Sequence, residues 1–109
     1  AHEAGVPLAV DSTFASPALQ QPLALGADLV VHSLTKYICG HGDALGGAVI
    51  GPVKTVQKIR KEMLLHLGGA MSPFNAWLIQ RGAVTLPLRM RQHCESAQRV
   101  AEFLEGLSI

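Results

Sequence analysis

Two short apolar runs, each ending in a polar residue, constrain the fold of this chain more than any other feature. Pro7-Leu8-Ala9-Val10-Asp11 and Asp28-Leu29-Val30-Val31-His32 each have the length of a strand that is buried on both faces. Residues 12–27 lie between them and include a helical turn, 22–26, that is stopped by glycine. This spacer is long enough for the crossover that two parallel strands require. The sequence therefore predicts a parallel β-crossover-β unit in an α/β domain, right-handed by default.

Polar residues with complementary chemistry follow both runs. Asp11 ends the first run, and Ser33, Thr35 and Lys36 follow the second. Since ligands in open α/β sheets bind beyond the carboxyl ends of the strands, we expect these side chains to converge. A lysine amine can form a Schiff base with an aldehyde, two hydroxyls can hold a phosphate, and a carboxylate can keep a pyridine nitrogen protonated. The pattern indicates a site for pyridoxal 5'-phosphate (PLP).

Each of these residues also has an ordinary interpretation. Asp11 could cap a turn after a strand, Lys36 could be a surface lysine, and the hydroxyls could cap a turn. Their combination favours the cofactor. We further expect Ser33 and Thr35 to alternate as strand residues do, so that both hydroxyls face the phosphate while Leu34 turns into the core.

Two other interpretations of the same region are disfavoured. His32, His41 and Asp43 do not stand at a ligand spacing typical of structural zinc, so no metal site is expected. The glycine-rich segment 40–47 lacks the lysine and hydroxyl that a Walker loop needs after its second glycine. Cys39 has no base near it in sequence and is interpreted as a packing residue.

The remaining elements follow from periodicity and capping. Residues 45–51 are expected to form a third strand, whose paired glycines permit close backbone approach. A helix that covers the sheet is expected from Val53 to Leu67, because its apolar residues recur at helical spacing. Ser72-Pro73 is a strong helix start and predicts a helix to Gly82, and an apolar stripe from Leu86 to Leu104 predicts a long final helix.

Composition limits the classes of partner. The chain has 109 residues, of which 49% are hydrophobic and 16% charged, with a net charge of +1 and no block of like charge. This balance gives no argument for a nucleic-acid or membrane partner. Two distant cysteines, Cys39 and Cys94, favour reduced thiols and a cytoplasmic location. The absence of an initial methionine and the helix-end pattern of residues 1–5 suggest an internal piece of a longer protein.

Several segments together resemble the Cys/Met-metabolism PLP enzyme family. The resemblance is carried by residues 10–14, 26–38 and 40–43, and continues through 72–77, 81–82 and 85–90. It covers nearly the whole chain. One departure is Ser12, where the family most often has asparagine. The resemblance implies the type I, aspartate aminotransferase-like fold, with residues 1–70 in the PLP-binding large domain and 71–109 starting the C-terminal domain.

By position, the resemblance implies a role for each candidate residue. Lys36 is similar to the family's Schiff-base lysine, Asp11 to the partner of the pyridine nitrogen, and Ser33 and Thr35 to the hydroxyls on the phosphate. Thr13 would lie near the ring. The family's ring-stacking tyrosine and phosphate-binding helix N-terminus would lie upstream, and its arginine for the substrate carboxylate downstream. Members work as homotetramers, dimers of dimers with shared active sites.

The activity that this resemblance favours is γ-elimination on a sulfur amino acid, of the methionine γ-lyase type, which yields methanethiol, ammonia and 2-oxobutanoate. The alternatives are γ-replacement, as in O-acylhomoserine sulfhydrylases or cystathionine γ-synthases, and an inactive α/β interaction fragment. We expect a small amino-acid substrate, and we expect the 109 residues by themselves to bind PLP poorly.

Overall fold

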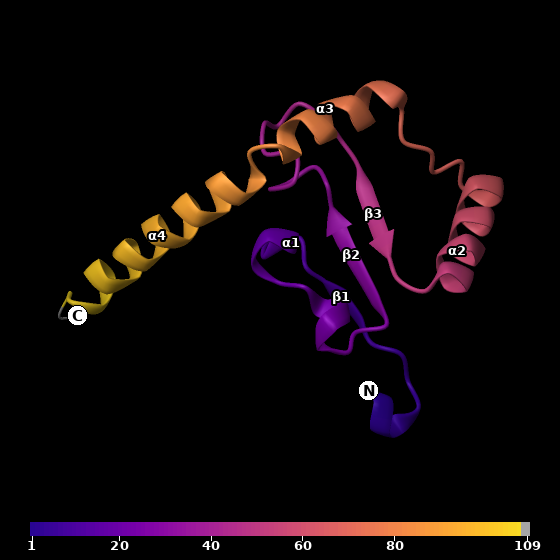
Figure 1. Cartoon of the computed structure of the whole chain (residues 1–109), viewed down its shortest axis with the longest axis horizontal. Helices are drawn as coiled ribbons and strands as arrows, with labels where there is room; N and C mark the ends of the chain where they lie inside the picture. Colours follow the sequence, from indigo (N-terminus) through magenta and orange to yellow (C-terminus); the bar gives the residue numbers. More distant parts are fainter. Residues whose placement is uncertain (108–109) are drawn as a thin grey trace.

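The computed structural model describes residues 1–107 and shows a small sheet with helices beyond its ends (Figure 1). The strands are β1 (Ala9–Asp11), β2 (Leu29–Ser33) and β3 (Gly47–Ile50), in the order β1-β2-β3. β1 and β2 are parallel, with Asp11 opposite Val31, and β2 and β3 are antiparallel, with Val31 opposite Val49. The predicted parallel unit and third strand are confirmed, and β3 adds an antiparallel edge.

The crossover between β1 and β2 contains two short helices, of which only the second was predicted. These are α1 (Ser16–Leu19) and the 3-10 helix η2 (Pro22–Leu25). η2 ends at Gly26, whose φ of 96° lies in the left-handed region that glycine adopts without steric cost. A third short helix, η1 (His2–Ala4), precedes β1 and ends at Gly5.

The two faces of the sheet differ in exposure. Val30, at 3% exposed, and His32, at 5%, lie on the face that shares an apolar cavity of about 450 Å³ with the crossover. Asp11, Val31 and Val49 pair across the other face and are exposed. The prediction that the strands are buried on both faces is therefore wrong for the described chain, because nothing in residues 1–107 covers the second face.

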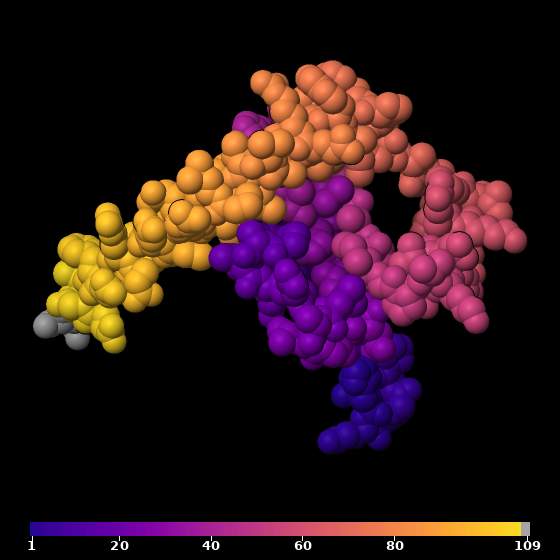
Figure 2. Space-filling model, in the orientation of Figure 1, coloured from indigo at the N-terminus to yellow at the C-terminus, as the bar shows by residue number. Residues whose placement is uncertain are grey.

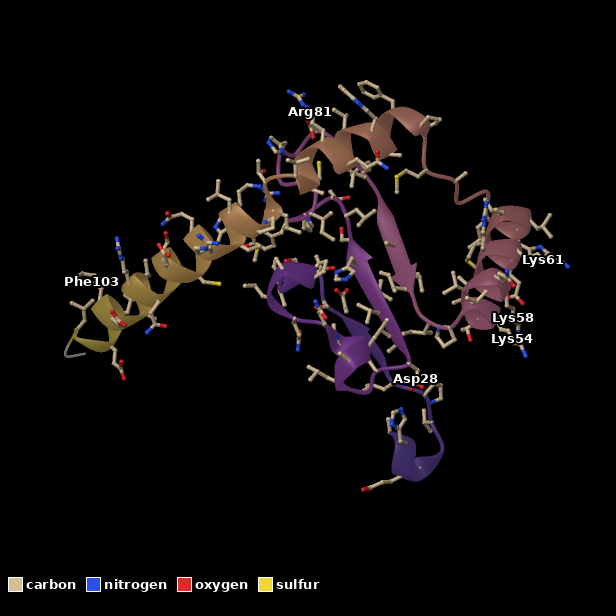
Figure 3. All side chains as sticks on the ribbon, viewed as in Figure 1. Asp28, Lys54, Lys58, Lys61, Arg81 and Phe103 are labelled. Atoms are coloured by element: carbon tan, nitrogen blue, oxygen red, sulfur yellow. The ribbon has the colours of Figure 1, made fainter. Side chains whose placement is uncertain are left out.

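α2 (Val53–His66) begins and ends close to the predicted positions. It lies beside the end of β3 and not over a face of the sheet (Figure 1), and it buries none of its residues. Lys54, Lys58 and Lys61 project from its outer side (Figure 3). The helix predicted by periodicity is confirmed, but its predicted covering role is not observed.

α3 (Pro73–Ala83) and α4 (Leu86–Glu105) continue the chain from α2. Ser72 caps α3, since its side chain accepts a hydrogen bond from the backbone N–H of Asn75 at 3.1 Å. α4 runs away from the sheet, with Phe103 near its far end (Figure 3). Only the first turns of α4 meet the rest of the described chain, and beyond Met90 its predicted apolar stripe is exposed.

The core lies where the segment after β2 meets the α3–α4 junction. It consists of Ile38, Cys39, Ala44, Ile79, Leu86 and Met90, with Leu34 packed against it as predicted. The space-filling view shows α2 separated from α3 by an open gap and α4 projecting as an arm (Figure 2). Within residues 1–107, no helix has the length and apolarity to cross a membrane. The core therefore anchors the segment that follows β2, which contains Lys36.

Candidate functional site

The segments that follow β1 and β2 are in direct contact. The Thr13 hydroxyl accepts a hydrogen bond from the backbone N–H of Ser33 at 2.8 Å. One residue further along, the ring of Phe14 lies edge-on to that of Tyr37, with centroids 5.9 Å apart. Because β1 and β2 are parallel, both segments leave the sheet at the same edge. The predicted convergence of these strand ends is confirmed.

Asp11 is the last residue of β1, and its side chain is exposed on the open face of the sheet. The pKa of Asp11 lies below its ordinary value of 3.8. The larger cause is the hydrogen bond with the Thr13 side chain, and the second is the Thr13 backbone N–H, which donates to Oδ1 at 2.9 Å. The carboxylate is therefore negatively charged at neutral pH. Thr13 is itself buried at 6% exposure, so it fixes Asp11 and the start of the Ser33 turn at once.

Lys36 lies in a tight turn after β2. Its backbone N–H donates to Ser33 O at 3.2 Å, and its carbonyl accepts from Gly40 N at 2.7 Å. Ile38 and Cys39, in the same turn, are buried in the core. The Lys36 side chain is exposed and has no hydrogen-bond or ion-pair partner within residues 1–107. A fixed backbone thus presents a free amine.

Lys36 lines a cavity of about 400 Å³ together with aromatic and cationic residues. The lining residues are Phe14, Lys36, Tyr37, Gly40, Arg89 and His93. The Tyr37 ring lies between those of Phe14 and His93, and the Tyr37 and His93 ring centroids are 5.2 Å apart. The cavity is therefore lined by a lysine, an arginine and three aromatic rings that meet edge to face.

The two hydroxyls proposed for phosphate differ in their surroundings. The Ser33 hydroxyl has no hydrogen-bond partner in the described chain, whereas Thr35 Oγ1 accepts from Gly46 N at 3.1 Å and donates to Gly46 O at 3.4 Å. β2 ends at Ser33 and Thr35 lies in the turn. The prediction that both residues alternate along one strand is therefore wrong at Thr35, because its hydroxyl bonds the start of the β3 segment instead.

Sequence reasoning assigned neither Arg89 nor His93 to the site. Both are contributed by α4, far along the chain from Lys36. Arg89 lies within the family-like segment 85–90 and four residues after Thr85, a spacing that places the two on one helix face. That spacing is the sequence signal that could have identified Arg89. His93 gives no such signal, because it falls on the apolar stripe of the predicted final helix. The described residues contain no group of acidic, histidine or cysteine side chains arranged for a metal.

Comparison with known families identifies the chain. The model of the Cys/Met metabolism PLP-dependent enzymes matches residues 1–108. The chain belongs to this family. Members of this family are PLP-dependent enzymes, so PLP is its cofactor.

Relatives within the Cys/Met metabolism family carry several activities. A canavanine gamma-lyase from Rhizobium leguminosarum bv. trifolii is 60% identical over 106 residues, which are 97% of this chain and 26% of that protein. An L-methionine gamma-lyase from Porphyromonas gingivalis is 52% identical over 105 residues, 95% of this chain and 26% of that protein. The chain thus spans about a quarter of the length of these curated relatives.

A solved structure supports the fold. A crystal structure of cystathionine gamma synthase from Xanthomonas oryzae pv. oryzae, in complex with aminoacrylate and cysteine, matches with a TM-score of 0.91 and 47% identity. The match covers 99% of this chain and 28% of that chain. The described residues therefore form part of the PLP-dependent fold of that family.

The donor set of this chain fits the cofactor of its family. A free amine can bond to an aldehyde carbon, an ionised carboxylate can pair with a protonated ring nitrogen, and a free hydroxyl can donate to a phosphate. Lys36, Asp11 and Ser33 supply these groups from one edge of the sheet.

Proposed function

We propose that the polypeptide containing this chain is a PLP-dependent γ-lyase in which Lys36 binds the cofactor and Asp11 pairs with its ring nitrogen. Ser33 and Thr35 would hold the phosphate, and Thr13 would lie beside the ring. The observation that carries the proposal is that Asp11 ends β1 and Lys36 follows the end of the parallel neighbour β2, in a chain whose relatives include two kinds of γ-lyase.

Each residue has a defined chemical task in this proposal. When bound, PLP supplies an electron sink for negative charge at the substrate's α-carbon. Asp11 keeps the ring nitrogen protonated, because a carboxylate next to that nitrogen favours its charged form. Lys36 would tether the cofactor through its amine, and as a free amine it would move protons among the substrate carbons.

The substrate we propose is an amino acid with a leaving group on its γ-carbon, with methionine as the first candidate. Elimination from methionine consumes water and releases methanethiol, ammonia and 2-oxobutanoate. The 60% identity to a canavanine gamma-lyase supports canavanine as an equal candidate. The likeness to cystathionine gamma synthase favours γ-replacement as the alternative reaction, in which a thiol takes the place of the leaving group on the γ-carbon and the leaving group is released.

Residues 1–70 are proposed to belong to the cofactor-binding domain and residues 71–109 to begin the C-terminal domain. α3 and α4 would then link the two. The open sheet face and the exposed stripe of α4 are consistent with further protein packing on both. We propose a homotetramer, built as a dimer of dimers, as the working form.

A substrate panel tests the reaction. The native polypeptide that contains this sequence is purified with PLP and given methionine, canavanine, and O-acetylhomoserine with sulfide, and 2-oxobutanoate and new thioether or thiol products are measured. Formation of 2-oxobutanoate from methionine or canavanine is expected. Turnover of O-acetylhomoserine with sulfide alone would overturn the γ-lyase assignment in favour of γ-replacement, and turnover of none would contradict both.

A further inference from the structure

The guanidinium of Arg89 makes three hydrogen bonds, to acceptors from three places in the chain. Nη1 donates to Tyr37 O at 2.9 Å, Nη2 donates to Gly82 O at 3.1 Å, and Nε donates to Thr85 Oγ1 at 2.9 Å. Tyr37 precedes Arg89 by 52 residues. Arg89 therefore connects the turn after β2 to the end of α3 and the start of α4.

The acceptor on that turn is the carbonyl of the residue immediately after Lys36. The carbonyl of Lys36 itself accepts from Gly40 N at 2.7 Å, and the N–H of Cys39 donates to Leu34 O at 2.9 Å. The turn therefore has internal hydrogen bonds along its length, and Arg89 adds the bond that connects it to the α3–α4 junction through a side chain. Arg89 and Lys36 also line the same cavity.

The surrounding backbone is shaped around this contact. A Cβ atom at Gly40 would collide with the Arg89 guanidinium, and a Cβ at Gly82 would collide with the Cys39 carbonyl. Gly40 also has a φ of 74°, which an L side chain rarely adopts. Glycine at these two positions allows the turn to approach α3 and Arg89 closely.

Arginine is suited to this position in a way that lysine is not. Its planar guanidinium holds five N–H donors in a rigid fork, so one side chain reaches three acceptors in fixed directions. A lysine ammonium is a single flexible point of charge. The three acceptors are all neutral oxygens, so the directions of these bonds, and not an ion pair, hold the guanidinium in place.

We propose that Arg89 is a positioning residue for Lys36. Arg89 fixes the turn that carries the cofactor-binding amine. The inference rests on the proposed role of Lys36. A misplacement of about 1 Å of a reacting group can cost about 10²-fold in rate, so loss of the bond to Tyr37 O is expected to affect kcat more than substrate binding.

The test compares Arg89→Ala and Arg89→Lys with Arg91→Ala in the native polypeptide that contains this sequence. Arg91 is an exposed arginine two residues along the same helix, with no side-chain partner in the described chain. Amide hydrogen exchange of residues 34–40 is measured without PLP. Thermal unfolding is measured for each variant. Values of kcat and KM are measured in the presence of PLP, on a substrate that the wild type turns over. Both measurements are made with and without methylguanidinium.

Faster exchange of residues 34–40 is expected in both Arg89 variants and not in Arg91→Ala. In Arg89→Ala, kcat is expected to fall by about 10- to 100-fold with KM changed by less than about threefold, and methylguanidinium to recover part of kcat. Arg89→Lys is expected to lose kcat as well, and it carries the test if Arg89→Ala fails to fold.

Three results would overturn the inference while leaving the proposed function intact. In the first, the wild type binds PLP and turns over substrate, the Arg89 variants fold, and their kcat and hydrogen exchange equal those of Arg91→Ala. The second is methylguanidinium restoring the melting temperature of Arg89→Ala but not its kcat, which would make the role structural only. The third is unchanged exchange of residues 34–40 in the folded Arg89 variants, a measurement that needs no PLP. A wild type that fails to bond PLP at Lys36 would instead overturn the proposed function.

Discussion

At the scale of single residues, Asp11 is the side chain whose charge the proposed chemistry needs. Replacing Asp11 with Asn keeps its size and an acceptor for the Thr13 N–H but removes the negative charge. We expect Asp11→Asn to retain PLP and to lose about 10²- to 10³-fold in kcat, comparable to the loss of other preorganised electrostatic groups. Asp28→Asn, at the opposite end of the sheet, is the control. Equal kcat values for the two variants in steady-state assays would contradict the role.

The pH dependence of Asp11 follows from its contacts with Thr13. Because they lower its pKa below 3.8, Asp11 stays ionised at any higher pH and protonates only as the pH falls through the lowered value. A loss of kcat/KM on the acid side that is centred above 3.8 must then come from another group. Such a loss is expected to persist unchanged in a pH–rate profile of Asp11→Asn, and its disappearance there would contradict the assignment.

Gly82 is the residue whose replacement should most disturb the Lys36 turn without touching its chemistry. A methyl group at this position would collide with the Cys39 carbonyl, so the turn or α3 would have to move. Gly82→Ala is expected to destabilise the fold by about 1–3 kcal/mol, the usual cost of overpacking. Thermal or urea unfolding measures this loss. Gly69→Ala is the control, because an added Cβ there meets no atom within 4 Å, and equal stability of the two variants would contradict the close approach.

At the scale of elements, Asp28 connects η1 and the approach to β1 with the start of β2 (Figure 3). Its Oδ2 accepts from Leu8 N at 2.7 Å and lies 2.7 Å from His2 Nε2. The Leu8 backbone hydrogen bond first, and the His2 side chain second, lower the pKa of Asp28 below its ordinary value of 3.8. A lowered carboxyl pKa contributes stability above the ordinary value, and that stability is lost as the pH falls through the lowered one.

We therefore expect residues 1–8 to loosen in acid before the rest of the chain. The Leu8 amide resonance should shift in an NMR titration below about pH 3.8, and Asp28→Asn should abolish that step. A Leu8 resonance that titrates identically in Asp28→Asn would show that another group controls this segment.

The elements themselves were predictable where a local signal determines them. Ser72-Pro73 gives the start of α3 and helical periodicity gives α2, both close to the observed bounds. The end of β2 was not predictable, because the Thr35 hydroxyl bonds Gly46, a partner that only the tertiary fold brings near. The same holds for the site: Asp11 and Lys36 follow strand patterns in the sequence, whereas Arg89 reaches the Lys36 turn from 52 residues beyond Tyr37.

At the scale of the whole molecule, the described chain is extended and exposes much apolar surface. Its radius of gyration is 17.1 Å, whereas a compact domain of this length would have about 13 Å. Exposed apolar side chains include Leu67, Trp77, Phe103 and Leu104. Extensive exposure of large apolar side chains is typical of surfaces that pack against other protein. The core around Cys39 is small by comparison.

The 109 residues expressed by themselves are therefore expected to bind a hydrophobic dye such as ANS, to associate, and to turn over no amino-acid substrate. Dye fluorescence and size-exclusion chromatography with light scattering check the first two, and the native polypeptide that contains the sequence serves as the comparison. If the 109 residues were monomeric, bound no dye and had robust lyase activity, the site would be complete without further protein and this expectation would be wrong.

The central claim is that Lys36 and Asp11 hold one PLP between two adjacent strand ends. Its most direct measurement is borohydride reduction of the native polypeptide in the presence of PLP, followed by peptide mapping by mass spectrometry, for the wild type, Lys36→Ala and Asp11→Asn. The account predicts a pyridoxyl group on Lys36 in the wild type and in Asp11→Asn, and on no lysine in Lys36→Ala. A wild-type adduct on a different lysine, or an unchanged adduct yield in Lys36→Ala, would contradict it.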